Sequence, residues 1–344
     1  MRRSPACLLV LVVAAVTACG SPVTPGSDAS IAPGDASVAA APDLSPSLPS
    51  YTVHFGPVDV APGYENTQCI IKRLGNPTPI HVGSIHDRLG DASHHMIVYR
   101  VADTMEQPAP FDCTPFKDTL DPTKGSPIIV SQKRDDLLTL PPGVAFNLDA
   151  NQMVRVEMHY INATTAKVTL DSSATFTTID EAAYKDEAGF LFIGSPDIQI
   201  PAMSKLTLGP DYFVLPPQYA QAKFFAITGH EHRLGTGVTV STAASATDPG
   251  TSVYDVPGWT WSEPATVIQD PPFTVPAGGG FKFTCQWNNT TGDGVQFGES
   301  ATNEMCFFWA YYYPNQGAKV CVHTKQGGGL DFCCPGSQFC KFIP

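Results

Sequence analysis

The stretch 153-MVRVEMHYI-161 shows the pattern that decides the fold of this chain. Apolar and polar side chains alternate through it, and β-branched and aromatic residues are frequent. Residues i and i+2 of a β-strand point to the same face of its sheet. The stretch therefore predicts a β-strand, and His159 lies in it.

Similar short runs recur along the chain, separated by Pro and Gly, and no long stretch has a 3.6-residue period. They are 96-MIVYRV-101, 189-GFLFIG-194, 223-KFFAITG-229, 236-TGVTVST-242 and 281-FKFTCQW-287. Many short strands predict an all-β protein built from β-sandwiches. Because 344 residues exceed one ordinary core, we expect two consecutive domains, at 51–183 and 184–318. The polar stretch 171–188 is the expected junction between them, with the alternative that part of it is still strand.

The composition fits a globular protein and argues against one class of partner. Hydrophobic residues make up 43% of the chain and charged residues 15%, and the formal net charge is −12. Binding to a nucleic acid backbone needs clustered Lys and Arg, and no such cluster exists in the sequence. We therefore expect no nucleic acid partner.

The N-terminus resembles the export signal of a bacterial lipoprotein. Two arginines precede the apolar run 6-ACLLVLVVAAV-16, which is too short for a stable membrane span. The small-residue stretch that ends at Cys19 predicts a signal peptide over 1–18 and lipidation of Cys19. An ordinary signal peptide with a chance Cys is the alternative. Residues 19–50, rich in Pro, Ala and Ser, then form a tether to the cell-envelope membrane. Gly20 gives a weak preference for the outer membrane.

The remaining cysteines indicate an oxidised, exported protein. Apart from Cys7 and Cys19 there are eight, and an even number predicts disulfides. Four of them lie in 321-CVHTKQGGGLDFCCPGSQFC-340, so 319–344 is expected to be a small disulfide-stapled tail. A metal site that uses His323 and these thiols is a less favoured alternative. Sequence spacing alone does not fix the pairing.

Four motifs contain residues that bind metals. They are 94-HHM-96, 157-EMHYIN-162, 229-GHEHRLG-235 and 303-NEMCFFWAYYYP-314. In a strand, His230 and His232 would project side by side from one face. Taken singly, each motif also has an ordinary explanation as surface histidines, a structural histidine or core filler. Together they supply five imidazoles and one thioether, a ligand set that favours copper over zinc. A cupin-type metal site is less favoured, because no carboxylate follows the His-x-His.

The order of these motifs resembles the copper type II, ascorbate-dependent monooxygenase family across about residues 55–315. That resemblance implies two jelly-roll β-sandwiches, each with one copper, that face each other across a solvent-filled cleft. It implies that the first copper, bound by His94, His95 and His159, accepts electrons from ascorbate or a similar reductant. The second copper would be bound by the catalytic residues His230, His232 and Met305. There dioxygen binds, and an unactivated C–H bond is converted to C–OH.

The resemblance also implies two disulfides. Cys69 and Cys113 match a family pair in the first domain, and Cys285 and Cys306 match a pair in the second. Because Cys306 directly follows Met305, the second bridge would fix the segment that carries the sulfur ligand.

The sequence departs from the peptide-amidating members of the family at the positions that grip a substrate carboxylate. Thr228 stands in place of an Arg, and Phe307 and Trp309 replace Asn and Tyr. Without a guanidinium fork we expect a small, uncharged or weakly polar substrate rather than a peptide carboxylate. In a strand, the odd-numbered residues from Met305 to Tyr313 would form an apolar face near the second copper. The alternative is that they pack the core. Glu231 is expected to point away from the metal, toward solvent or behind the ligands.

Two other classes of function stay open at this point. One is a copper-binding lipoprotein without efficient catalysis, and the other is a structural β-sandwich protein of the cell surface. For the monooxygenase, the expected partners are dioxygen, a small-molecule substrate and a one-electron reductant, with a membrane contact through the lipid anchor only.

Overall fold

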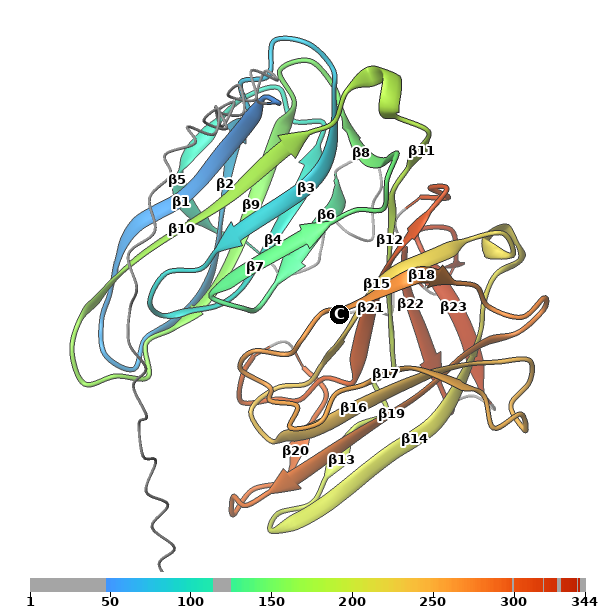
Figure 1. The fold of residues 1–344 in the computed structure, drawn as a ribbon. Helices are drawn as coiled ribbons and strands as arrows, with labels where there is room; N and C mark the ends of the chain where they lie inside the picture. The colour runs from blue at the N-terminus through green and yellow to red at the C-terminus, as the bar shows by residue number, and fades with distance from the viewer. Residues whose placement is uncertain are drawn as a thin grey trace, which may run out of the picture. The chain divides into compact units, whose positions relative to one another are not determined.

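The computed structural model describes residues 48–113, 125–298, 300–317, 319–326, 329–338 and 340. The expected signal peptide, Cys19 and nearly all of the tether lie outside these residues. Within them no helix has the length and apolarity needed to cross a membrane. The expected all-β class is confirmed, because two β-sandwiches follow one another along the chain (Figure 1).

The first sandwich consists of two sheets, which are antiparallel except for one parallel pair at the end of the first sheet. One sheet has the order β1(Ser50–Val60), β10(Val168–Thr178), β3(Ile80–Arg88), β8(Val144–Leu148), β11(Asp186–Glu187), and β7(Asp135–Thr139) also pairs with β3. The other has the order β5(Gln107–Asp112), β2(Glu65–Arg73), β9(Met153–Ile161), β4(Ser93–Val101), β6(Ser126–Ser131). The first half of the expected junction is thus the end of a strand, and the 3₁₀ turn Glu181–Ala183 follows it.

The second sandwich also has two main sheets. One has the order β18(Val267–Phe273), β15(Lys223–His230), β21(Phe307–Tyr313), β12(Gly189–Gly194), β22(Lys319–Thr324), β23(Leu330–Cys334). The other has the order β14(Ser204–Val214), β19(Gly280–Asn289), β16(Gly235–Ala243), β17(Thr251–Asp255). A short pair, β13(Gln199–Ile200) and β20(Val295–Gln296), lies beside them. A second 3₁₀ turn, Pro217–Tyr219, precedes β15.

The central strands of the two sandwiches are buried on both faces. All but the last residue of β9 is buried, as is every residue of β12. Along β21 the odd residues Phe307, Trp309 and Tyr311 belong to the same apolar core as the first sandwich. The even residues Phe308, Ala310 and Tyr312 belong to the core of the second sandwich. Continuous apolar runs suit such strands, because neither face meets water.

This packing corrects the expectation of a solvent-filled cleft between the domains. Met305 and the odd residues of β21 share one continuous apolar cluster with residues of the first sandwich. A direct hydrogen bond also joins the two sandwiches, from the Val130 amide to the Tyr311 hydroxyl at 3.1 Å. The physical reason is the aromatic content of β21, whose exposure on a cleft wall would cost apolar hydration.

The cysteine-rich tail adds strands to the second sandwich. Within it, β22 pairs in parallel with β12 and antiparallel with β23, so the tail extends an existing sheet. Disulfides join Cys321 to Cys333 and Cys334 to Cys340. All four cysteines of the tail are in disulfides, so none of them offers a thiolate to a metal shared with His323.

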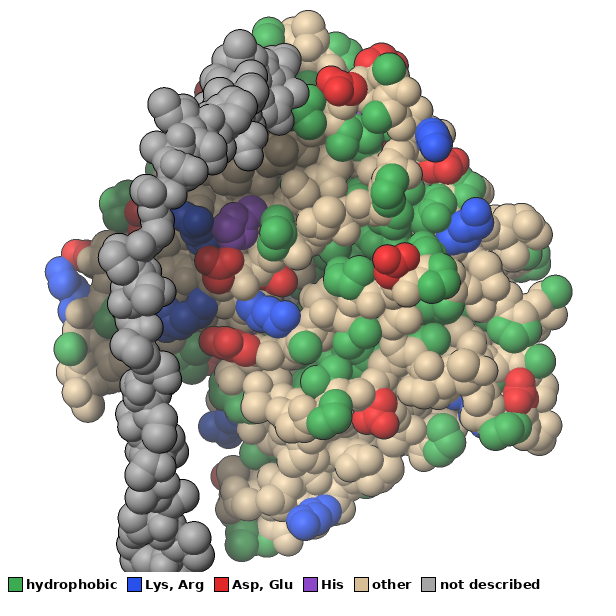
Figure 2. Space-filling view, in the orientation of Figure 1, with side chains coloured by type: hydrophobic (Ala, Val, Ile, Leu, Met, Phe, Trp, Pro, Cys, Tyr) green, Lys and Arg blue, Asp and Glu red, His purple; other side chains and the backbone are tan. Residues whose placement is uncertain are grey.

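On the face drawn in Figure 2, basic and acidic side chains are interspersed rather than gathered by sign.

Candidate metal centre

Two neighbouring strands of the first sandwich bring three imidazoles together. His94 and His95 are the second and third residues of β4, and His159 lies opposite His95 on β9. Adjacent residues of a regular strand point to opposite faces, but the register of β4 shifts between Ser93 and His95. That irregularity lets both rings approach His159. Each of the three residues offers a nitrogen, and these nitrogens lie within 4.8 Å of one another.

Two further imidazoles come from the second sandwich. His230 is the last residue of β15, whereas His232 lies in the turn that follows. The expectation that both project from one face of a strand is therefore wrong, because His232 lies outside β15. Their ring centroids are nevertheless 5.1 Å apart. The change of chain direction after His230, and not the alternation of side chains along a strand, therefore brings the two rings together.

The two groups of histidines meet in one cluster. Ring centroids are 6.1 Å apart for His94 and His232, and 6.4 Å apart for His95 and His230. Each of the five residues is at most 5% exposed. The resemblance implied two sites on opposite walls of a cleft, and the structure instead places them in contact inside the protein.

Protein acceptors hold one nitrogen of three of these rings. Glu65 Oε1 lies 2.9 Å from His159 Nε2, and Gln132 Oε1 lies 2.8 Å from His230 Nδ1. The Asn303 carbonyl oxygen lies 3.1 Å from His232 Nδ1. These oxygens accept, so each ring nitrogen carries the proton and the other nitrogen keeps a free lone pair. This is the arrangement by which proteins orient metal-bound histidines.

The electrostatics of the cluster favour neutral rings. Burial lowers the pKa of His94 to about 3 and that of His232 to about 4. Burial likewise lowers the pKa values of His95 and His230 well below 6.5. In addition, His94 Nε2 is buried with no hydrogen-bond partner among the described residues. Neutral imidazole is the metal-binding form, and a buried unpaired nitrogen is costly unless something binds it. The donor set therefore fits a soft or borderline metal such as copper.

Met305 lies two residues before Phe307, the first residue of β21. His230 pairs with Phe307, so Met305 precedes the partner of His230 by two residues, as His232 follows His230 by two. Met305 is 4% exposed and belongs to the apolar cluster shared with the first sandwich. The register thus brings the segment of Met305 to the turn that carries His232.

Glu304 ties these two segments together and was missed at the level of sequence. Its carboxylate accepts hydrogen bonds from the amides of His232 and Leu234, at 2.9 and 2.8 Å, and from Trp287 Nε1 at 2.9 Å. Burial raises the pKa of Glu304 to about 7. The signal in the sequence is a single acid next to a long aromatic run. An acid in such a place is expected to be buried, and a buried carboxylate needs several hydrogen-bond donors.

Glu231 is buried. Of the two expected positions, the one facing solvent is wrong and the one behind the ligands is confirmed. It accepts hydrogen bonds from the amides of Gly237 and Gln286, at 3.1 and 2.8 Å. Burial raises its pKa to about 9. The side chain anchors the turn between His230 and His232 to the backbone of β16 and β19.

Both expected disulfides of the two domains are present. Cys69 of β2 is joined to Cys113, and Cys285 of β19 is joined to Cys306. The second bridge fastens the residue that follows Met305 to the opposite sheet of its sandwich.

Comparison with known proteins gives one match to a protein family. Residues 212–329 match the family described as "Copper type II ascorbate-dependent monooxygenase, C-terminal domain". This segment belongs to the copper type II, ascorbate-dependent monooxygenase family. The match contains His230, His232 and Met305, and the family implies dependence on copper and ascorbate. No curated protein matches the chain.

Solved structures add only distant likenesses. A glycosylasparaginase, PNGase F from Flavobacterium meningosepticum, is 11% identical with a TM-score of 0.35, covering 82% of this chain and 99% of that one. The infectious bursal disease virus VP2 subviral particle is 11% identical with a TM-score of 0.21, covering 78% of this chain and 72% of that one. Scores this low carry no argument about function.

The residues where this monooxygenase-family domain departs from the peptide-amidating pattern are interior. Thr228 is 1% exposed and its hydroxyl lies 2.9 Å from that of Thr266. Phe307 and Trp309 are 4% and 2% exposed, and Trp309 lies 5.9 Å from His230 between ring centroids. Phe307 and Trp309 therefore pack in the core and do not line a substrate site, which is the alternative given in the sequence analysis.

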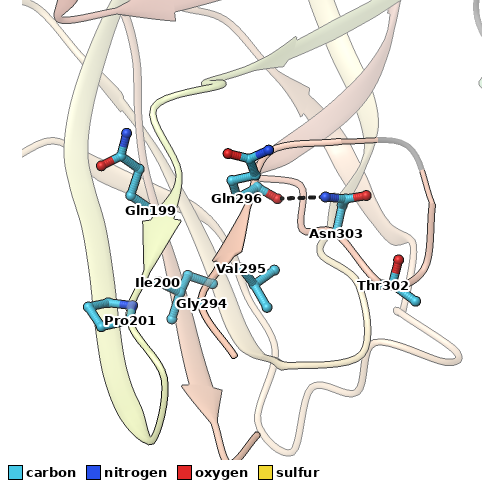
Figure 3. A pocket seen from close by; sticks show the side chains of 8 residues that line it. All are labelled: Gln199, Ile200, Pro201, Gly294, Val295, Gln296, Thr302 and Asn303. Carbon is cyan, nitrogen blue, oxygen red and sulfur yellow. Dashed lines mark hydrogen bonds between the residues drawn. The ribbon is translucent and has the colours of Figure 1, made fainter. Parts of the chain in front are cut away.

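A polar groove lies in the same domain, beside the segment that contacts His232. It has a volume of about 470 Å³ and is lined by the paired strands β13 and β20 and by Thr302 and Asn303, and Figure 3 shows side chains of Gln199, Gln296 and Asn303 around it. None of the described residues that line it carries a charge. Asn303 links the groove to the cluster, because its carbonyl oxygen accepts from His232.

Proposed function

We propose that this protein is a copper-dependent monooxygenase that hydroxylates an unactivated C–H bond of a small substrate. Dioxygen supplies the inserted oxygen atom, and its second atom leaves as water, with two electrons from ascorbate or another one-electron reductant and two protons from solvent. The observation that supports this most directly is the buried cluster of five imidazoles, three of which have one nitrogen held by a protein acceptor. The family of residues 212–329 supports the same reaction class.

We assign the ligands in two sets. His94, His95 and His159 would hold the first copper ion, and His230, His232 and Met305 the second. Bound copper supplies the one-electron chemistry by which dioxygen is reduced. The thioether of Met305 favours the reduced ion, because soft sulfur prefers Cu(I). The centre that holds the reduced ion would supply electrons to dioxygen, so Met305, His230 and His232 are the proposed catalytic residues.

The chain's own groups would orient these ligands and exclude water. Glu65, Gln132 and Asn303 fix which nitrogen of His159, His230 and His232 faces the metal. The surrounding apolar cluster keeps bulk water away, which protects reactive oxygen chemistry from side reactions.

The substrate is proposed to be uncharged or weakly polar. Thr228 offers no guanidinium for a carboxylate, and the groove beside Asn303 has no charged lining among the described residues. The protein would reach its substrate from the bacterial cell envelope, most simply the outer membrane, held there by the lipid on Cys19.

A second function is favoured by one observation. All five histidines are at most 5% exposed, so a small ion reaches them more easily than an organic substrate does. That burial suits a lipoprotein that holds copper without efficient catalysis.

The test compares the full-length chain with Met305→Ala. We expect two copper ions per chain by metal analysis, and a sulfur scatterer in the X-ray absorption spectrum of the reduced protein that disappears in the variant. Met203→Ala is the control, since Met203 is 74% exposed and its loss should change neither signal. One copper or none would contradict the two-centre proposal.

Oxygen uptake then separates the two functions. Ascorbate-dependent consumption of dioxygen that rises with an uncharged substrate supports the monooxygenase. Two bound coppers without such stimulation across a broad screen would favour the copper-holding role. Turnover confined to compounds that carry a carboxylate would overturn the proposed substrate class.

A further inference from the structure

One carboxylate oxygen of the first sandwich touches both sandwiches. Glu65 is the first residue of β2, and its Oε1 accepts from His159 Nε2 at 2.9 Å and from the amide of Ala301 at 3.1 Å. His159 is 94 residues away along the chain and Ala301 is 236. The two donors come from different sandwiches, so a single atom joins them.

The position of Glu65 is set by the register of its sheet. Glu65 pairs with Ile161 of β9, and Thr67 pairs with His159. The carboxylate therefore reaches diagonally along β9 to the imidazole, a contact that neighbouring strands allow. Its side chain is 25% exposed, so both hydrogen bonds form at the margin of the buried cluster. The hydrogen bond from His159 lowers the pKa of Glu65 to about 2, and an ionised acceptor strengthens both bonds.

Ala301 begins the segment that leads to Met305. Ala301 is 4% exposed. Backbone hydrogen bonds hold the residues that follow it. The Asn303 amide donates to the Ser300 carbonyl at 2.8 Å, and the Glu304 amide donates to the Gln296 carbonyl at 3.0 Å. Asn303 and Glu304 also contact His232. The amide of Ala301 is thus the point at which this segment is fastened to the first sandwich.

We propose that Glu65 is a positioning residue that couples the two sets of ligands, by orienting His159 and fastening the Ala301–Met305 segment with the same oxygen. The part of this inference that concerns copper rests on the proposed function. The part that concerns the segment holds for the metal-free protein. Loss of the carboxylate should disturb both sets at once, although Glu65 binds no metal itself.

The first experiment uses the metal-free, full-length protein. Hydrogen–deuterium exchange at the Ala301 amide should accelerate on the order of tenfold or more in Glu65→Ala, because a hydrogen bond to a charged group is lost. Glu65→Gln keeps an acceptor oxygen without the charge and should give an intermediate rate. The control is Asp135→Ala, which removes a comparable carboxylate–imidazole contact, 2.7 Å from His86 Nε2, in the same sandwich. Unchanged exchange at Ala301 in Glu65→Ala would overturn the inference.

The second experiment examines the copper-loaded protein. In Glu65→Ala we expect the Cu(II) spectrum of the His159 site to change and the sulfur scatterer of the reduced form to weaken together. Copper affinity should fall roughly 10–100-fold, as when a group that orients a metal-bound histidine is removed. A change in the His159 signal alone would show that Glu65 orients one ligand and couples nothing.

The two experiments separate the two ideas. If wild-type protein binds no copper, the proposed function fails, while the exchange of Ala301 still decides the coupling. If copper binds as two ions and Glu65→Ala alters neither the exchange nor the sulfur signal, the coupling fails and the proposed function stands.

Discussion

At the scale of the residue, Asp87 is an acid in a place that suits a neutral group. It lies on β3, opposite Asp136 of β7, and is fully buried. Neither of its carboxylate oxygens has a hydrogen-bond partner among the described residues. Burial, and then the charge of Asp136, raise the pKa of Asp87 well above 3.8. The protein therefore folds with this side chain protonated.

Asp87→Asn should stabilise the protein increasingly as the pH rises. A folded pKa above the unfolded value means that the stability from Asp87 is full below about pH 3.9 and is lost as the pH rises toward the folded pKa. Each pH unit in that window costs the wild type about 1.4 kcal/mol, which the amide avoids. Thermal unfolding from pH 4 to 8 measures the difference. Asp103→Asn is the exposed control. A difference in stability between Asp87→Asn and the wild type that stays constant with pH would contradict this prediction.

At the scale of the element, the start of β21 is held from both sides. Cys306 is bonded to Cys285 of β19, and Glu304 accepts from the amides of His232 and Leu234. Met305 lies between these two anchors. A flexible thioether side chain can contribute to a defined site only if its backbone is fixed, and the two neighbours provide that fixation.

Replacing both Cys285 and Cys306 by Ser should loosen this element. The bridge closes a separation of 21 residues, and loss of such a cross-link costs about 3 kcal/mol. Chemical denaturation measures this loss, and the sulfur scatterer of the copper-loaded reduced form should weaken with it. The control is the double Ser variant at Cys334 and Cys340, whose separation is 6 residues. Equal effects of the two double variants would show that the bridge beside Met305 has no special role.

At the scale of the whole molecule, the inner sheets of the two sandwiches share one apolar core, and the five histidines lie within it. The Gln132 side chain reaches His230, the Val130 amide reaches the Tyr311 hydroxyl, and Glu65 reaches Ala301. These contacts hold the two sets of histidines together. The same packing removes the cleft that separate domains would leave.

Two copper ions bound in this arrangement should interact magnetically. We expect the electron paramagnetic resonance signal of the fully oxidised, two-copper protein to be broadened or reduced relative to the sum of two isolated centres, because the ring centroids of His94 and His232 are 6.1 Å apart. His230→Ala, loaded with one copper, supplies the isolated signal of the first site. A simple sum of two independent signals would mean that the sites lie far apart when copper is bound.

The sequence by itself determined the class of fold and the set of candidate ligands. Short runs such as 153–161 and 189–194 coincide with β9 and β12, since alternation and β-branched content are local properties. The order of the histidine motifs predicted the family that residues 212–329 match. Both domain disulfides also followed from that resemblance.

Only the tertiary structure decided what covers each face and which distant groups meet. Alternation placed Phe307, Trp309 and Tyr311 on one face of β21, but it could not tell a substrate wall from a surface packed on the first sandwich. Glu65 and Gln132 gave no sequence signal, because their partners Ala301 and His230 lie 236 and 98 residues away. Contacts over such separations depend on the register and packing of whole sheets. The spacing of residues along the chain does not contain that information.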